Sequence, residues 1–300
     1  DNVKIQARAS ESGLSVAVLN QTDSIVDFEG SLYVDGEGFS LYSTGGAVTN
    51  ALAAGKDKIL IGDMYSNSDG QINVLLDMAD SLFEGAALIG TAGGEINFTM
   101  SDLSLWRMLG DSSVTALAVS SGAIVDMTQY DDYQQLEISE LSGSGGEFIM
   151  KTDLASETDG DKLYVTDAAA GTSQFVQVND VSIINGAVVT GDKKLLLITD
   201  ASKNVEFIGK NLNNGGLWDI TPTLENGLAV GGSEEEWYLT KLRKEANNDT
   251  SVLLGAADNA YAMWRNTNDT MRQRLGDLRH NKINEGDGLW TRYTGGRFGG

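Results

Sequence analysis

Four aspartates lie close together in the middle of the chain, and a group of acidic side chains could bind a metal ion. Asp153, Asp159, Asp161 and Asp167 fall in one short stretch of sequence, and carboxylate oxygens are the ligands that Ca²⁺ prefers. Their spacing does not follow the EF-hand loop and is that of turns between strands. We therefore interpret them as turn residues, and we expect no metal site and no cofactor.

Catalytic chemistry also finds little support in the sequence. A Ser-His-Asp triad needs a histidine, and His280 is the only one in the chain. It lies in a polar segment near the C-terminus, where a linker residue is the simpler interpretation. The close-set glycines of Gly90–Glu95 are not followed by the Gly-Lys-Ser/Thr of a phosphate-binding loop. We expect no catalytic residue and no enzyme activity.

The net charge is −22, and it is unevenly distributed along the chain. Residues 241–300 hold ten of the 21 Lys and Arg residues but only seven of the 43 acids, which leaves residues 1–240 with a net charge of −25. Such a surface repels nucleic acid and anionic headgroups, so neither is expected as a partner of this region. The absence of cysteine suits an exported chain that stays unfolded while it crosses an oxidising compartment.

Residues 3–239 repeat a short alternating strand followed by a turn rich in Gly, Asn or Asp. Many short strands at this spacing are typical of a β-sandwich or of a stacked β-solenoid. Pro222 is the only proline, whereas an ordinary chain of this length would carry about fifteen, and ladders of paired strands exclude proline from their interiors. The turns are instead supplied by 36 glycines. This composition favours the solenoid, with roughly ten coils of about 20–25 residues each.

The alternation predicts which side chains point into the solenoid. Residues expected on inward faces are Leu136 and Ile138; Phe148, Met150, Thr152 and Leu154; Leu163 and Val165; Val176 and Val178; and Leu195, Leu197 and Thr199.

The end of the sequence differs from the rest. Residues 250–279 contain no proline, and their apolar residues recur at spacings of mainly three, four and seven, which predicts an amphipathic helix that extends over as much as this whole range. Residues 288–298 then alternate aromatic and polar side chains, as a strand of a membrane β-barrel does. One strand cannot close a barrel, so we expect the rest of such a barrel to lie beyond Gly300.

Four short patterns in residues 104–239 carry a resemblance to a known family. They are Trp, Ser-x-Val and Leu-x-Val at Trp106, Ser113, Val114, Leu117 and Val119; Gly-x-Phe-x-x-x-Thr-Asp-Leu at Gly146, Phe148, Thr152, Asp153 and Leu154; Gly-Asp-Lys-Leu at Gly160–Leu163; and Trp-Tyr-Leu at Trp237–Leu239. With these patterns in the family's order, the region resembles the C-terminal part of a pertactin-like autotransporter passenger, from the type V secretion systems of Gram-negative bacteria. Met271–Arg279 and Gly288–Gly296 resemble the family's pore helix and first barrel strand.

The resemblance implies an all-β fold. It predicts right-handed parallel β-helix (β-solenoid) coils over residues 1–145, a C-terminal β cap or autochaperone region over 146–240, a pore helix over 250–279, and the first strand of a truncated outer-membrane β-barrel over 288–298. The residues expected in the core of the cap are Phe148, Thr152, Leu154, Leu163, Val165, Val176, Val178, Phe207, Trp218, Trp237 and Leu239. Those expected in the pore helix are Arg272, Arg274, Leu275 and Arg279, and those at the start of the barrel are Trp290 and Arg292.

The same resemblance implies a function without catalysis. The chain is expected to be a C-terminal passenger fragment, an extracellular stalk anchored at the cell surface of a Gram-negative bacterium, whose last coils nucleate folding and support secretion. Expected partners are its own translocator β-barrel, the outer-membrane assembly machinery, periplasmic chaperones and a ligand on the host surface. Large aromatic side chains in residues 146–240 would make this region the most stable unit.

Two alternatives remain open at this stage. The rod could itself be an adhesin whose exposed strand faces bind host glycans or proteins. It could also be a β-helix enzyme acting on acidic polysaccharide, but such a groove would need acids beside Lys or Arg, and the 11 basic residues of residues 1–240 are scattered.

Overall fold

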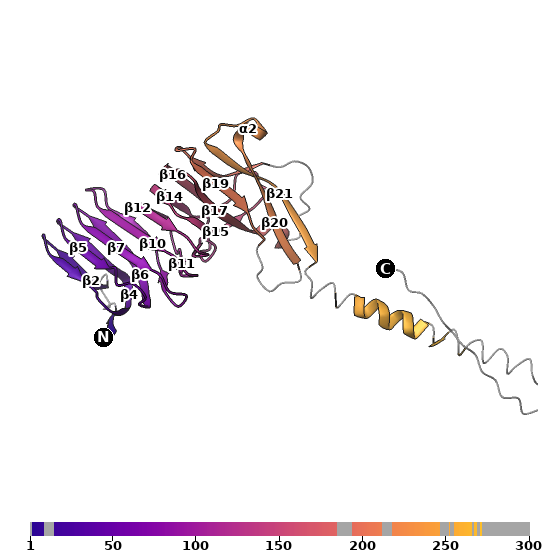
Figure 1. Cartoon of the computed structure of the whole chain (residues 1–300), viewed down its shortest axis with the longest axis horizontal. Coiled ribbons are helices and arrows are strands. Elements are labelled where there is room, and N and C mark those ends of the chain that lie inside the picture. The colour runs from indigo at the N-terminus through magenta and orange to yellow at the C-terminus, as the bar shows by residue number, and fades with distance from the viewer. Residues whose placement is uncertain are drawn as a thin grey trace, which may run out of the picture. The chain divides into compact units, whose positions relative to one another are not determined.

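The computed structural model describes residues 2–8, 15–184, 194–211, 218–246, 252, 255–265, 267–268 and 271. The chain divides into two compact units, Asp1–Glu245 and Ala246–Gly300. The larger unit is a right-handed parallel β-solenoid with a short antiparallel end, and Figure 1 shows its successive turns from the N-terminal strands to the hairpin of β20 and β21. In the described part of the chain, no helix is long and apolar enough to cross a membrane.

The strands of the described residues form two sheets of 11 and 10 strands. The first sheet contains β1 (Asn2–Ala7), β2 (Val16–Gln21), β4 (Ser31–Thr44), β6 (Lys58–Asn67), β8 (Leu82–Glu84), β9 (Ala87–Ile89), β11 (Leu105–Arg107), β13 (Ile124–Asp126), β15 (Ser144–Thr152), β17 (Thr172–Asp180) and β19 (Val205–Gly209). The second contains β3 (Ile25–Asp27), β5 (Val48–Ala51), β7 (Gln71–Leu76), β10 (Glu95–Met100), β12 (Ser112–Val119), β14 (Gln135–Ser142), β16 (Lys162–Ala168), β18 (Leu195–Asp200), β20 (Trp218–Asn226) and β21 (Glu236–Ala246). Two single-turn helices interrupt them, α1 (Val181–Ile184) and α2 (Gly227–Val230).

Successive turns pair in parallel, and the register of each pair gives the length of the turn. Asp27 pairs with Asn50 and Asn50 pairs with Asn73, so these turns fall within the predicted length of about 20–25 residues. Between β16 and β18, Leu163 pairs with Ile198, so that turn is about half as long again. The predicted length is therefore correct for the early coils and too short for the last ones. The solenoid has about seven turns rather than ten.

The inward-facing side chains form one continuous apolar core. Phe83, Phe98 and Trp106 stack within it, with ring centroids 5.2 to 5.5 Å apart. Trp106 Nε1 donates a 3.0 Å hydrogen bond to the backbone oxygen of Gly85, so the indole also satisfies its polar atom. This stack lies before residue 146, and aromatic burial therefore does not by itself single out residues 146–240 as the most stable region.

The predicted inward faces are confirmed with one exception. Side chains that are at most 2% exposed are those of Leu136, Ile138, Phe148, Met150, Thr152, Leu154, Leu163, Val165, Val176, Val178, Leu195 and Leu197. The prediction for Thr199 is wrong, because Ile198 enters the core in its place. The pairing of β18 with β21 shifts register between Leu196 and Ile198, and such a bulge reverses the alternation beyond it.

One corner of the solenoid requires glycine. Gly62 has a φ of +102°, and a Cβ on it would lie 2.1 Å from the backbone oxygen of Gly36 in the preceding turn. A Cβ on Gly85 would likewise lie 2.6 Å from the backbone oxygen of Gly62. Because only glycine avoids both the strained φ and the contact, the first sheet can bend there while its turns keep their close spacing.

In the smaller unit, residues 255–265 are helical, as are the described residues 252, 267, 268 and 271. The helix predicted over residues 250–279 is therefore confirmed for its described part, where Tyr261 and Trp264 are 60% and 61% exposed and their rings lie 6.0 Å apart. The pore-helix residues Arg272, Arg274, Leu275 and Arg279, the strand over residues 288–298, and its Trp290 and Arg292 lie outside the described residues. Those assignments stay predictions.

We expect Trp106→Ala to lower the free energy of unfolding by about 3–5 kcal/mol, because it removes a fully buried ring from the aromatic stack. Trp106→Phe should cost less, about 1–3 kcal/mol, since it keeps a ring but leaves the backbone oxygen of Gly85 without its donor. Urea unfolding followed by circular dichroism measures both. A loss below about 1 kcal/mol for Trp106→Ala would contradict the core position.

Candidate functional site at the closed end of the solenoid

The C-terminal end of the solenoid is closed by two strands that abandon the parallel order. β21 pairs with β18 in the antiparallel direction, and β20 is the outermost strand of the same sheet (Figure 1). The reversal runs through α2, where Asn226 Oδ1 accepts a hydrogen bond from the backbone N–H of Leu228 and Gly231 adopts the left-handed conformation. This hairpin lies at the end of the region predicted as the C-terminal cap, residues 146–240, and it occupies the edge on which a further parallel turn would pair.

The outermost strand carries the only proline of the chain. Pro222 lies in β20, and it offers no backbone N–H for pairing, which is why sheets tolerate proline mainly on edge strands. A Cβ on Gly209, the last residue of β19, would lie 2.1 Å from the backbone oxygen of Pro222. The hairpin thus reaches the end of the first sheet as well, and its outer strand is a poor template for another chain.

Most residues assigned to the core of the cap are buried. Of that set, those at most 4% exposed are Phe148, Thr152, Leu154, Leu163, Val165, Val176, Val178, Phe207 and Leu239. Trp237 is partly buried, and its ring meets that of Phe207 edge-on at 5.7 Å. Trp218 begins β20, and its side chain is outside the described part of the structure. These contacts place the residues in one cluster, while their role in folding stays a prediction.

Buried aspartates fix the turns that lead into the cap. Asp180 is 1% exposed; its Oδ2 accepts hydrogen bonds from Thr152 Oγ1 at 2.9 Å and from the backbone N–H of Leu154 at 2.8 Å. Its Oδ1 accepts from the backbone N–H and hydroxyl of Ser182. One carboxylate therefore ties the end of β15 to the start of α1, and without it several buried donors would be unsatisfied.

Asp161 makes a second buried connection. It is fully buried; its Oδ1 accepts from the backbone N–H of Gln134 at 2.8 Å and its Oδ2 from that of Lys151 at 2.5 Å. Burial raises the pKa of Asp161 to about 7, against the opposing effect of these two N–H groups. The carboxyl group therefore changes its charge near neutral pH while holding two turns together.

The other aspartates considered as metal ligands accept local hydrogen bonds. Asp153 Oδ1 accepts from the backbone N–H of Ala155, Asp159 Oδ1 from the hydroxyl of Thr158, and Asp167 Oδ1 from the backbone N–H of Ala168. Across the described ranges, no group of three or more His, Cys, Asp or Glu is arranged to hold a metal ion. The interpretation as turn residues fits Asp153 and Asp159, which lie between β15 and β16, whereas Asp167 lies within β16.

A polar column joins three successive turns on the outside of the cap. Glu147 Oε2 accepts a hydrogen bond from Gln177 Nε2, and its Oε1 pairs with Lys210 Nζ. The same ammonium group lies 5.4 Å from the ring centre of Phe175. Because these residues belong to β15, β17 and the segment after β19, the column holds the last turns of the first sheet in register.

Most of these polar residues were not predicted from the sequence. A usable signal exists for Asp180 and for the buried Asp200, which ends β18. Each ends an alternating strand and precedes a serine by two residues, Ser182 and Ser202. An aspartate that accepts from the backbone two residues later is a common way to begin a turn, and both aspartates do so here.

Residues 114–241, which run from β12 to β21, match the family model described as pertactin. The chain contains a pertactin-like passenger domain. The passenger is 27% identical over 247 residues to "Autotransporter CRAC" of Citrobacter rodentium, which covers 72% of this chain and 14% of the relative. It is 28% identical over 229 residues to "Autotransporter adhesin/invasin TibA" of Escherichia coli, which covers 74% of this chain and 21% of that relative. The chain thus spans about a seventh of the length of the first relative and about a fifth of the length of the second.

The passenger should lose stability as the pH rises through the titration of Asp161. Its folded-state pKa of about 7 lies above the ordinary value of 3.8, so the folded chain holds this proton longer than the unfolded chain does. The contribution of this group therefore lowers the free energy of unfolding between about pH 4 and pH 7 and is constant above.

Asp161→Asn should remove that part of the slope, whatever its effect on the absolute stability. Urea midpoints from pH 4 to pH 8 measure it, with Asp159→Asn as a control at an exposed neighbour. An Asp161→Asn slope equal to that of the parent protein would show that the group does not titrate as described.

Proposed function

We propose that the chain is the C-terminal stalk of an autotransporter passenger, whose last coils fold first and support secretion across the outer membrane. The observation that carries the proposal is the closed C-terminal end of the solenoid. There the antiparallel hairpin β20–β21 takes the place of a further parallel turn.

A closed end gives folding a starting point. A parallel turn has no partner for its apolar face and its backbone until a neighbouring turn is in place. The chain must also lose conformational entropy to close the turn before any of those contacts form. The hairpin and the turns next to it, over residues 146–240, provide a surface on which the preceding turn can pair, and they need no further turn on their own C-terminal side. Folding would then proceed toward the N-terminus, each turn forming on the one before it.

The family resemblance connects this direction with secretion. In autotransporters the C-terminal part of the passenger reaches the outside first, so turns that form there would keep the chain from sliding back. The partners that go with this proposal are the translocator β-barrel of the same protein, the outer-membrane assembly machinery and periplasmic chaperones. The location is the cell surface of a Gram-negative bacterium, and no nucleic acid partner is included.

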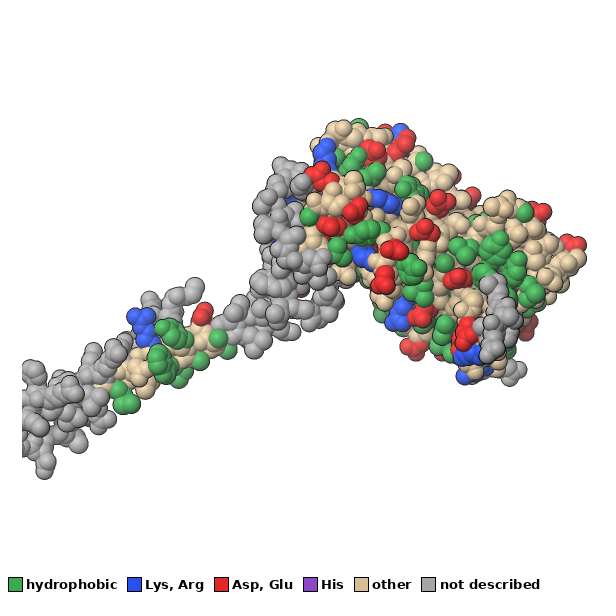
Figure 2. Space-filling view, turned by 180° about the vertical axis from the view of Figure 1, so that it is seen from behind, with side chains coloured by type: hydrophobic (Ala, Val, Ile, Leu, Met, Phe, Trp, Pro, Cys, Tyr) green, Lys and Arg blue, Asp and Glu red, His purple; other side chains and the backbone are tan. Residues whose placement is uncertain are grey.

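The proposal assigns no enzyme activity to the chain. Acidic side chains are scattered over the face of the solenoid shown in Figure 2, and basic ones are few. An enzyme acting on acidic polysaccharide would need basic groups near its catalytic acids, and the 11 basic residues of residues 1–240 are scattered along the sequence. The support for a stalk is therefore structural: a rigid core with charged side chains spread outside it.

Adhesion is a second candidate function, and two observations favour it. The relative from Escherichia coli is described as an adhesin/invasin. In addition, the outer face of the second sheet carries a hollow beside Asp27 and Asn50. A stalk and an adhesive surface are compatible, because the first depends on the core and the second on side chains outside it.

Cell-surface display separates the cap from the other coils. In the full-length precursor, Phe207→Ala should reduce the amount of passenger on the surface at least severalfold, because it opens a cavity under Trp237 in the first region to fold. Phe83→Ala makes the same change at a buried site in an earlier coil, with a similar expected cost of about 3–5 kcal/mol, and should reduce display less. Equal losses would argue against a special role of the cap.

Limited proteolysis tests which region is most stable. In moderate urea, a protease-resistant fragment that spans residues 146–240 should outlast any fragment from residues 1–145, because the sealed turns have the fewest open edges. Mass spectrometry of the surviving fragments identifies them. Survival of an N-terminal fragment would contradict the proposed order of folding.

A further inference from the structure

Four side chains of the second sheet form a chain of hydrogen bonds from turn to turn. Asn97 Nδ2 donates to Asn73 Oδ1 at 2.9 Å, Asn73 Nδ2 donates to Asn50 Oδ1 at 2.7 Å, and Asn50 Nδ2 donates to Asp27 Oδ1 at 2.7 Å. All three amides donate in the same direction, so the column ends at the carboxylate of Asp27. The residues occupy matching register positions on β3, β5, β7 and β10.

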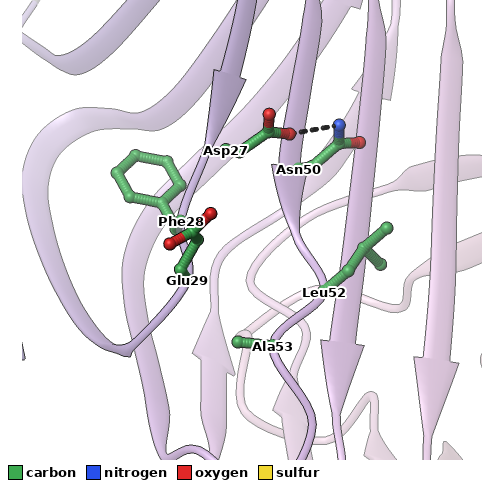
Figure 3. A pocket seen from close by; sticks show the side chains of 6 residues that line it. All are labelled: Asp27, Phe28, Glu29, Asn50, Leu52 and Ala53. Atoms are coloured by element: carbon green, nitrogen blue, oxygen red, sulfur yellow. Dashed lines mark hydrogen bonds between the residues drawn. The ribbon is translucent and has the colours of Figure 1, made fainter. Parts of the chain in front are cut away.

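A hollow of about 340 Å³ opens beside the end of this asparagine column. Its lining residues are Asp27, Phe28, Glu29, Asn50, Leu52 and Ala53. Figure 3 shows Asp27 and Asn50 joined by their hydrogen bond, with Phe28 and Glu29 following on one chain segment and Leu52 and Ala53 on the other. The volume lies at the lower end of the range for ligand pockets, about 300–1,000 Å³.

The polar groups of the hollow are mainly hydrogen-bond acceptors. Within the described residues, the Asp27 carboxylate receives one hydrogen bond, from Asn50, and the Glu29 carboxylate receives none. Asn50 uses its oxygen toward Asn73 and one N–H toward Asp27, which leaves one N–H to donate. A ligand that fits must therefore bring several donors and can accept from one.

The apolar part of the hollow sets a second requirement. Leu52 is 50% exposed, and Phe28 is only partly buried against the core. Together with the methyl group of Ala53 they add aliphatic and aromatic surface to the lining of the hollow. A sugar ring meets both requirements, because it presents a face of C–H groups and an edge of hydroxyl donors.

We propose that this hollow binds a sugar residue without acidic groups, carried on a neutral or amino-bearing glycan. The inference rests on the adhesive function proposed above and names its ligand and its site. The carboxylates of Asp27 and Glu29 accept hydrogen bonds from ring hydroxyls, while Phe28 and Leu52 contact the C–H face. Sialylated or sulfated sugars are excluded, since they would bring an anion next to two carboxylates on a chain of net charge −22.

The asparagine column makes the site rigid before any ligand arrives. Asn50 is held by hydrogen bonds on both sides, from Asn73 and to Asp27, and both lining residues stand on paired strands. Side chains that are already ordered lose little conformational entropy on binding. Asn73 is therefore a positioning residue, since it holds Asn50 without lining the hollow itself.

The test uses the whole chain on an array of neutral, amino-bearing, sialylated and sulfated oligosaccharides, followed by calorimetry with the neutral sugars that bind. Glu29→Gln and Asp27→Asn should each weaken binding about fivefold, or roughly 1 kcal/mol, because the amide keeps only one acceptor oxygen and lacks the charge that strengthens the hydrogen bond. Asn73→Ala should weaken it severalfold as well. Glu206→Gln, the same change at an exposed site on β19, should leave it unchanged, and circular dichroism checks that each variant is folded.

The outcomes distinguish this site from adhesion in general. Neutral-sugar binding that the three variants leave unchanged would overturn the site, while adhesion would stand. Binding to sulfated or sialylated glycans alone would overturn the ligand class. The ligand class would also be overturned if neutral sugars did not bind but a cationic oligolysine peptide did, with an affinity that falls as salt is added. Where no glycan binds, the inference fails, and a separate host-cell binding assay then decides whether adhesion fails with it.

Discussion

The structure depends on parallel backbone pairing between one turn and the next. This pairing stacks equivalent positions of successive turns, so that a residue type repeated at the length of a turn becomes a column in space. Inside the solenoid the columns are apolar, and Phe83 and Trp106 are direct neighbours in one of them. Outside, the same geometry lines up Asp27, Asn50, Asn73 and Asn97. Core and surface are therefore two consequences of a single repeat.

Parallel pairing also creates a problem at each end, because a turn without a neighbour exposes backbone donors and acceptors. The C-terminal end solves it by changing direction: an antiparallel hairpin pairs with β18, and Pro222 in its outer strand offers no backbone N–H to a further strand. Buried carboxylates such as Asp180 satisfy the backbone of the turns that the hairpin covers. The end is thus sealed by hydrogen bonding and shape, whereas the buried stack of Phe83, Phe98 and Trp106 lies in earlier turns. This separation is the reason to regard closure, and not aromatic content, as the distinguishing property of residues 146–240.

Much of the fold could be predicted from the sequence, because it depends on patterns with a short period. The alternation at Leu136 and Ile138 and the rarity of proline indicate stacked strands directly. The exception at Thr199 arises from a bulge, which changes the count by one residue without any local signature. The turn length was underestimated for the same kind of reason: the last turns contain inserted residues that no pattern marks. The asparagine column was missed, although its nearly even spacing along the chain stands in the sequence.

That column also shows how a site can arise on so regular a framework. Inside the column each side-chain amide donates one hydrogen bond to one neighbour and accepts one from the other. Such an amide has few free donors or acceptors for a ligand. Free side-chain acceptors of the column appear only where the repeat breaks. At one end Asn97 is followed in register by Ala116, which contributes no polar group; at the other, Asp27 replaces the amide with a carboxylate that needs only one donor from the column. The apolar side chains of Phe28 and Leu52 adjoin this second break, so the hydrogen-bond acceptors left over by the column and an exposed apolar surface meet at a single place on the outer face.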